Sequence, residues 1–223
     1  MNSAISDVAP MAIAVSISPL PIIAIILILL SQKARSNGVA FLLGWIIGLA
    51  VAEVAVLALV ILVNFTPGAG PLKLIAWLKV AVGVLVIFLG IRQWLQRPKP
   101  GEEPIMPRWM LSIDSLTPIR ALGLAAVLSA AGNIALILAA AVAIAQANLD
   151  IEQNASALGF FILIGSITVA AVVGYHVIAG DAATMRLTIW KTWLLKNNAT
   201  VMSVMLILVG VLLLSKGVSG LGI

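Results

Sequence analysis

Long stretches of hydrophobic residues dominate the chain, and most polar residues fall between them. A helix needs about 20 apolar residues to cross the hydrocarbon core of a bilayer, and six stretches reach or approach that length. They lack the alternation of barrel strands, and backbone groups in lipid must pair with one another, so each stretch is predicted to be a helix. The six stretches are Met11–Leu30, Ala40–Val63, Leu72–Ile91, Ala121–Ala147, Ala155–Ile178 and Ala199–Ser215.

The composition agrees with an all-α integral membrane protein. Of the 223 residues, 62% are hydrophobic and 9% are charged, whereas a soluble domain carries about 25% charged residues. This balance argues against a soluble enzyme, a nucleic-acid-binding protein and a disordered chain. The chain has no cysteine and one histidine, and no nucleophile–base pair is visible. We therefore expect no catalytic residues, no metal site and no cofactor.

Basic residues predict the orientation in the membrane. Ten of the 13 Lys and Arg residues lie between the first and second, third and fourth, and fifth and sixth stretches. Two, Lys73 and Lys216, lie on the other side, and Lys79 falls within the third stretch. Because cytoplasmic loops are enriched in Lys and Arg, both termini are predicted to be extracytoplasmic in a multi-pass protein of the cytoplasmic membrane.

A proline-rich segment, Pro98 to Pro118, separates three stretches from the other three. The predicted organisation is a single membrane domain with halves at 1–95 and 120–223 and a cytoplasmic linker at 96–119. Three helices per half invert the second half relative to the first, which is the 3+3 inverted repeat of many transporters. The third and sixth stretches align on Gly90 and Gly210.

The first stretch carries Ser18-Pro19-Leu20-Pro21 at its centre. Each proline lacks an N–H and clashes with the carbonyl four residues earlier, while Ser18 followed by Pro19 is a helix-start pattern. A helix that restarts there directs the positive end of its dipole at the midplane, which suits an anionic group. We therefore predict that Ser18, Pro19 and Pro21 form part of a substrate site; a simple kink is the alternative.

Polar residues also mark the fourth and second stretches. Ser129 and Asn133 share one face of the fourth, and they are predicted to contact substrate or to join helices. Glu53 and Lys79 lie at similar depths in the second and third stretches. They are predicted to form an ion pair, either structural or coupled to protons, because a lone charge in the membrane costs about 2.5–3.5 kcal/mol.

Gly44 and Gly48 form a Gly-xxx-Gly face on the second stretch. Such a face lets two helices approach closely, within one protein or between two copies. A homodimer through these glycines is therefore one expectation, and packing inside the chain is the other.

Two blocks of the sequence resemble a known family. SPLPIIAIILILLSQKARSNGVAFLLGWIIGLA (Ser18–Ala50) and PRWMLSIDSLTPIRALGL (Pro107–Leu124) are similar to the first half and the cytoplasmic loop of the GAP, or sulfolipid-addressing, family of the LysE (lysine-exporter) superfamily. That family carries Asn-Pro-Lys-Asn after a Leu-Ser pair in its fourth helix. Here Leu128-Ser129 is followed by AAGNIALIL, which leaves open whether this helix is broken. The resemblance implies six helices and export of envelope lipids or small solutes.

The leading interpretation is a transporter that moves an anionic or glycosylated envelope lipid across or out of the cytoplasmic membrane. An exporter of small polar solutes, such as amino acids, is the first alternative, and it needs a wetter cavity. A scaffold for lipid-synthesis enzymes is the second alternative. The expected partners are membrane lipids and a lipid or small-molecule substrate, and not nucleic acid.

Overall fold

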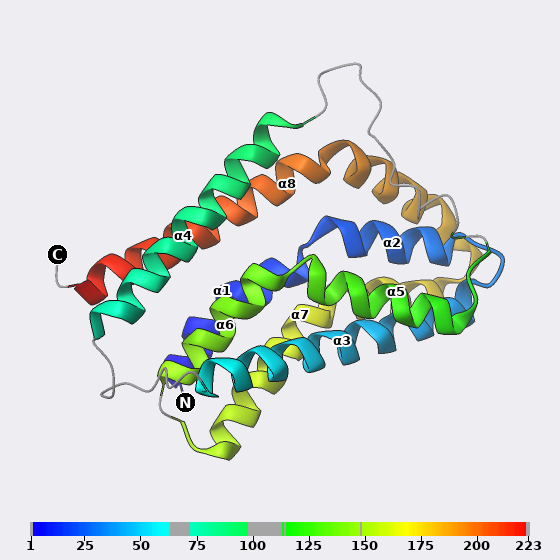
Figure 1. The fold of residues 1–223 in the computed structure, drawn as a ribbon. Helices are drawn as coiled ribbons and strands as arrows, with labels where there is room; N and C mark the ends of the chain where they lie inside the picture. The colour runs from blue at the N-terminus through cyan, green and yellow to red at the C-terminus, as the bar shows by residue number, and fades with distance from the viewer. Residues whose placement is uncertain (1, 63–71, 98–112, 114, 148, 222–223) are drawn as a thin grey trace.

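The computed structural model describes residues 2–62, 72–97, 113, 115–147 and 149–221. These residues form helices and no strand, as the hydrophobic stretches predicted. The described residues form eight helices. Figure 1 shows the beginning of the first helix and the end of the last at the same end of the molecule. The helices are α1 (Asn2–Ser16), α2 (Pro19–Leu29), α3 (Ala34–Leu62), α4 (Leu72–Leu95), α5 (Pro118–Ala131), α6 (Ile134–Gln146), α7 (Ile151–Ala179) and α8 (Asp181–Leu221).

Three of these helices, α3, α7 and α8, are long and apolar enough to cross a membrane. Two further spans are helix pairs bent at a break: α1 with α2 at 44° and α5 with α6 at 63°. The described apolar part of α4, Val80–Leu95, is shorter than a span. The described residues thus provide up to five membrane spans. The predicted linker falls mainly in 98–112, outside the described residues, so the division into halves stays a prediction.

The helix α2 lies at the centre of the molecule. It begins with Pro19 and Pro21 in its first turn, where a missing N–H leaves no hydrogen bond unmade. Its sequence is apolar on every side, and nine of its 11 residues are buried. A helix that is hydrophobic all round belongs inside a protein or in lipid, and neighbouring helices surround this one. After the proline break, the second half of the first span, α2, therefore lies among the other helices of the protein.

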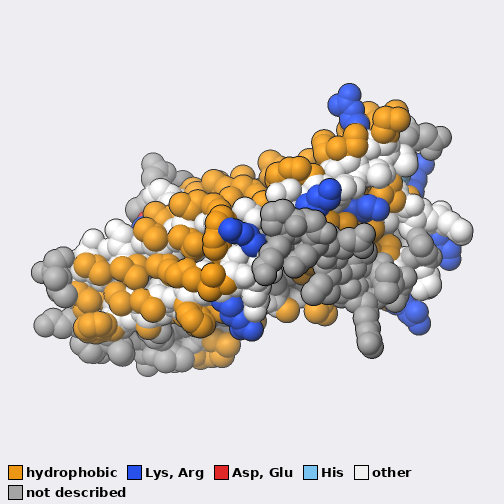
Figure 2. Space-filling model, turned by 90° about the horizontal axis from the view of Figure 1, so that it is seen from above, with side chains coloured by type: hydrophobic (Ala, Val, Ile, Leu, Met, Phe, Trp, Pro, Cys, Tyr) orange, Lys and Arg blue, Asp and Glu red, His pale blue; other side chains and the backbone are white. Residues whose placement is uncertain are grey.

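The remaining helices pack in two groups, visible in Figure 1. In the first, which we call the bundle, α3 packs along α5 and α1 packs along α7 around α2 and α6. In the second, which we call the arm, α4 runs antiparallel along the C-terminal half of α8. Figure 2 shows hydrophobic side chains over the part of the molecule toward the termini, with Lys and Arg side chains in the other half.

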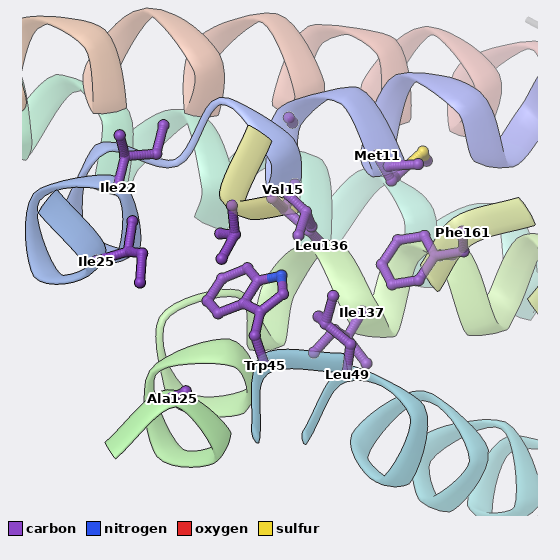
Figure 3. Packing of buried hydrophobic residues seen from close by; sticks show 14 of the residues in the cluster. Met11, Val15, Ile22, Ile25, Trp45, Leu49, Ala125, Leu136, Ile137 and Phe161 are labelled. Carbon is purple, nitrogen blue, oxygen red and sulfur yellow. The ribbon is translucent and has the colours of Figure 1, made fainter. Parts of the chain in front are cut away.

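The core of the bundle forms where α3 crosses its neighbours. Figure 3 shows Trp45 and Leu49 of α3 pointing toward Val15 of α1 and Ile137 of α6. The indole N–H of Trp45 donates a hydrogen bond to the backbone oxygen of Gly165 in α7, at 3.2 Å. This bond satisfies the one polar atom of a side chain that is otherwise fully buried among apolar groups.

Gly44 and Gly48 bring α3 against α5 inside the chain. A Cβ atom added to Gly44 would lie 2.1 Å from the backbone oxygen of Leu122, and one added to Gly48 would lie 2.6 Å from the Cα of Ala126. Of the two expectations for this face, the structure shows packing within one chain. The surface expected to serve a second copy is occupied by α5.

Glycines also set the contact within the arm. A Cβ atom added to Gly83 would lie 2.9 Å from the backbone oxygen of Gly210, and one added to Gly210 would lie 2.9 Å from that of Gly83. The glycine that faces Gly210 in the arm is Gly83, whereas the expected alignment pairs Gly210 with Gly90. Only glycine allows two helix backbones to come this close.

The neighbouring contacts of the arm are reciprocal as well. Gly90 packs against Ile207, and Gly217 packs against Val80. The same interval of 127 residues relates Val80 to Ile207 and Gly90 to Gly217, and it also relates Gly83 to Gly210. Two helices related by a two-fold axis through the Gly83–Gly210 contact would have such paired contacts, because the axis turns each contact into its counterpart.

We predict that Gly83→Ala and Gly210→Ala each lower the thermal stability of the purified protein in detergent. The added methyl group meets backbone, which yields less readily than a flexible side chain, so a loss of about 1–3 kcal/mol is expected. Gly123→Ala and Gly159→Ala are matched controls, because no atom lies within 4 Å of their added Cβ. Those two changes should be neutral or stabilise the helix by up to about 1 kcal/mol. Equal effects at all four glycines would contradict the close packing of the arm.

Candidate functional site

The break in the first span lies between Ser16 and Pro19 and faces the arm. Ser18 precedes α2 with φ −54° and ψ 117°, and its backbone N–H donates to the oxygen of Val15 at 3.2 Å. The Ser18 hydroxyl does not cap α2; it donates instead to the sulfur of Met202 in α8, at 3.8 Å. The side chain is 4% exposed. The predicted break therefore exists, and it contacts the arm through Ser18.

The fourth span is also broken, which the sequence left open. The helix α5 ends at Ala131, and α6 begins at Ile134. Between them, the side-chain N–H of Asn133 donates to the backbone oxygen of Ser129 at 3.1 Å. Asn133 is 2% exposed, and its side-chain oxygen has no hydrogen-bond partner in the described structure. A buried acceptor without a partner is costly, and it marks a place where a ligand or water is expected.

A cavity of about 410 Å³ opens beside this second break, between the bundle and the arm. Its floor is formed by the buried residues Asn133 and Leu136, and its rim includes the exposed residues Arg92 and Gln96. Arg92 is the one charged residue of the lining. The lining comprises Leu89, Arg92, Gln93 and Gln96 of the end of α4, Ala131 to Leu136 at the break, and Met202 and Leu206 of α8.

The predicted site residues occupy different places around this cavity. Asn133 lines it directly, whereas Ser18 reaches its wall through Met202. Pro19 and Pro21 are buried in the first turn of α2. The Ser129 hydroxyl donates to the backbone oxygen of Ala126 at 2.9 Å and lies toward α3, away from the lining. The structure therefore places Asn133 in the lining and Ser18 in contact with the lining residue Met202, and substrate contact by any of the five stays a prediction.

Sequence reasoning missed Arg92, Gln93 and Gln96. Arg92 was counted as one of the cytoplasmic basic residues, and the two glutamines carried no signal of their own. The cavity joins three segments that are far apart in the chain, so no spacing along the sequence identifies it. An amide-rich turn next to an arginine at a helix end, Arg92-Gln93-Trp94-Leu95-Gln96, is the only local hint.

At the end of the molecule near the termini, the same two groups of helices are held together. Lys216 of α8 in the arm forms an ion pair with Asp7 of α1 in the bundle. The space left between the groups here is about 30 Å³, with Met11, Val82 and Leu138 among its lining residues. That volume is enough for only one or two water molecules, since one needs about 10–15 Å³. The bundle and the arm are therefore closed at one end and parted at the other.

Glu53 lies in the interior of α3. Its side chain is fully buried, and neither carboxyl oxygen has a hydrogen-bond partner in the described part of the chain. The side chain of Lys79 lies outside the described residues, so the expected ion pair stays a prediction. The described contacts place α4 along α8, with α3 in the bundle.

We predict that the double change Glu53→Gln with Lys79→Met yields more folded protein than the worse of the two single changes. Neutralising one member of a pair leaves an uncompensated charge in a low-dielectric site, and neutralising both removes that cost. Expression and monodispersity of the three variants in detergent measure the effect. Each neutral residue also removes the cost of burying its own charge, so one single variant can be stable for that reason alone. The double variant is therefore compared with the worse of the two single variants. A double variant that is no better would show that the two residues do not interact.

Comparisons with known proteins agree with the resemblance seen in two blocks of the sequence. The family model described as Sap, sulfolipid-1-addressing protein, matches residues 8–219, which is nearly the whole chain. No curated protein and no solved structure matches the chain.

Proposed function

Because the chain belongs to the sulfolipid-1-addressing protein family, we propose that it is a transporter in the cytoplasmic membrane that moves an anionic or glycosylated envelope lipid across or out of that membrane. The observation that carries this proposal is the cavity between the bundle and the arm. It opens beside a broken membrane span, where backbone and buried polar groups are available to a ligand. The same two groups of helices meet at the opposite end.

The proposed architecture is six spans in a 3+3 inverted repeat, as in the LysE superfamily. Three features support it. The first and fourth hydrophobic stretches are both broken, and α3 and α7 have the same length of 29 residues. The contacts within the arm are reciprocal at an interval of 127 residues. With α4 as the sixth span, the chain has an even number of crossings, in keeping with both ends of the helical chain lying together.

Alternating access gives the ion pair and the cavity a common role. In such a cycle, one group of helices rocks against the other around a fixed site. The structure then represents a state that is closed near the termini, where Asp7 pairs with Lys216, and open beside Asn133. In this proposal Glu53 is the buried carboxyl group that takes up and releases a proton during the cycle.

The composition of the cavity favours a lipid over a small polar solute. Seven of the 12 lining residues have hydrophobic side chains, and the polar side chains are limited to three at the end of α4 and to Asn133 at the break. An amino acid would leave much of this wall without a polar partner. A scaffold has no need of a cavity beside a buried, unpartnered amide oxygen. Export of small solutes and a scaffold role remain the competing functions, and lipid profiling separates them from lipid delivery.

We predict that Pro19→Ala combined with Pro21→Ala keeps or raises thermal stability and lowers delivery of lipid to the cell surface. Each alanine restores an N–H and removes a helix clash worth roughly 3 kcal/mol in soluble helices, so the break tends to close. The measurement compares cell-associated with surface-extracted lipids in cells that lack the gene, that carry it, and that carry the variant. Pro10→Ala, in the interior of α1, is the matched control and should deliver normally.

Three outcomes contradict parts of this proposal. Unchanged surface lipids in cells that lack the gene would overturn lipid delivery. Full delivery by the double variant would overturn the role of the first break. Lost stability together with lost delivery would assign the prolines to packing instead.

We predict that both ends of the chain are extracytoplasmic. Lys and Arg side chains gather in the half away from the termini in Figure 2, where the positive-inside rule places the cytoplasm. A reporter that is active only in the cytoplasm should therefore be silent when fused to either end. The same reporter inserted in the linker at Gly101 should be active. Activity at both ends together with silence at the linker would invert the orientation.

A further inference from the structure

We propose that the cavity between the bundle and the arm is a two-point headgroup site, in which Arg92 binds an anionic group and the side-chain oxygen of Asn133 accepts a hydrogen bond from a hydroxyl. This inference rests on the proposed function and deepens it, because it assigns the residues that recognise the lipid. The ligand chemistry is an anionic ester on a hydroxylated headgroup. The argument uses the chemistry of the two ends of the cavity and of the wall between them.

Arg92 provides the cationic end. It lies exposed at the rim, and no acidic residue belongs to the described lining or forms an ion pair with it in the described structure. A guanidinium group presents a planar fork of N–H donors that fits sulfate, phosphate and carboxylate oxygens in pairs.

Asn133 provides the acceptor end, and its orientation follows from its partner. The backbone oxygen of Ser129 can only accept, so the atom that faces it at 3.1 Å is the side-chain nitrogen. The free atom is therefore the oxygen, which is buried and unpartnered. An oxygen acceptor repels an anion and needs a donor. A ligand that satisfies both Arg92 and Asn133 must carry a negative charge at one place and an O–H or N–H at another.

The wall between the two ends suits a hydroxylated group attached to a lipid. Gln93 and Gln96 each offer donors and an acceptor, which is the pattern that sugar hydroxyls match. The volume of about 410 Å³ falls in the range of about 300–1,000 Å³ that is typical of small-molecule pockets. The hydrophobic lining continues to Ile134, which is 54% exposed. Acyl chains can thus leave the cavity along an apolar surface while the headgroup stays inside.

The test measures binding of defined lipids to the full-length protein in detergent. The probes are 3-sulfogalactosylceramide, unsulfated galactosylceramide and phosphatidylglycerol, with soluble galactose 3-sulfate as a competitor. The variants are Arg92→Gln, Asn133→Leu and, as a matched control, Arg97→Gln. Arg97 lies five residues beyond Arg92, stacked on the ring of Trp94 at 3.9 Å and outside the cavity lining. Melting temperatures without lipid show that each variant is folded.

We expect the wild-type protein to bind the sulfated lipid about tenfold or more tightly than the unsulfated lipid, because a hydrogen bond to a charged group has that worth. Arg92→Gln should remove this preference and leave binding of the unsulfated lipid unchanged. Asn133→Leu should weaken binding of both glycolipids and also of phosphatidylglycerol, because its glycerol headgroup likewise carries an anionic ester and hydroxyl donors. Arg97→Gln should behave as the wild type.

Several results would overturn the site. One is equal wild-type affinity for the sulfated and unsulfated lipids. Another is an equal loss of affinity for the sulfated lipid in Arg92→Gln and Arg97→Gln, which would indicate general attraction to anionic lipid. If Asn133→Leu folds poorly, Asn133→Asp takes its place and should reduce binding of the sulfated lipid most. Full displacement by galactose 3-sulfate at the lipid's own concentration would overturn a lipid source for the headgroup. If Arg92→Gln binds normally but cells lacking the gene lose surface lipid, the headgroup site is rejected and lipid transport is retained.

If the variants show the expected binding pattern but cells lacking the gene keep their surface lipids, the headgroup site is retained and lipid transport is rejected.

Discussion

A backbone inside a bilayer has no water with which to pair, so each interrupted helix must find other partners for its freed groups. At each break of this chain the polar residue, Ser18 or Asn133, is buried within the protein. At the first, Ser18 donates through its backbone to Val15 and through its hydroxyl to Met202. At the second, Asn133 uses its amide nitrogen on Ser129 and leaves its oxygen unpaired. The need to shelter the breaks explains why α2 is central and why the arm packs beside them.

The close approach of α4 and α8 fixes the arm as a unit. Hydrophobic burial does not hold two helices together in lipid, so contact between backbones at glycine supplies the adhesion. A unit joined in this way can move against the bundle without exchanging its internal contacts. The bundle has comparable internal ties, because α3 approaches α5 at Gly44 and Gly48 and bonds to α7 through Trp45. In the proposed alternating-access cycle, the arm would rock against the bundle at their boundary, which is where the cavity lies.

Much of the fold could be read from the sequence, because apolar length and proline act locally. The hydrophobic stretches became helices, and Pro19 with Pro21 marked a break that exists. The second break has no proline, and it depends on a side-chain hydrogen bond that no periodicity reveals. The cavity forms where three segments that are distant in the sequence meet. The sequence alone therefore indicates Arg92 only as one of the basic residues that set the orientation in the membrane. Glycines spaced by seven residues occur in both α4 and α8, but only the contacts show that Gly83 faces Gly210.

In the proposed inverted repeat, the two halves differ at equivalent positions, and these differences have physical consequences. The interval of 127 residues that relates the glycines of the arm also relates Leu89 to Lys216. Leu89 lines the open cavity, whereas Lys216 pairs with Asp7 where the bundle and the arm are closed. An exact two-fold repeat would place the same side chain at both ends and give no preference between them. The contact between the bundle and the arm near the termini therefore includes an ion pair, whereas Leu89 can form no such pair at the cavity, and the two ends of this boundary differ in their electrostatics.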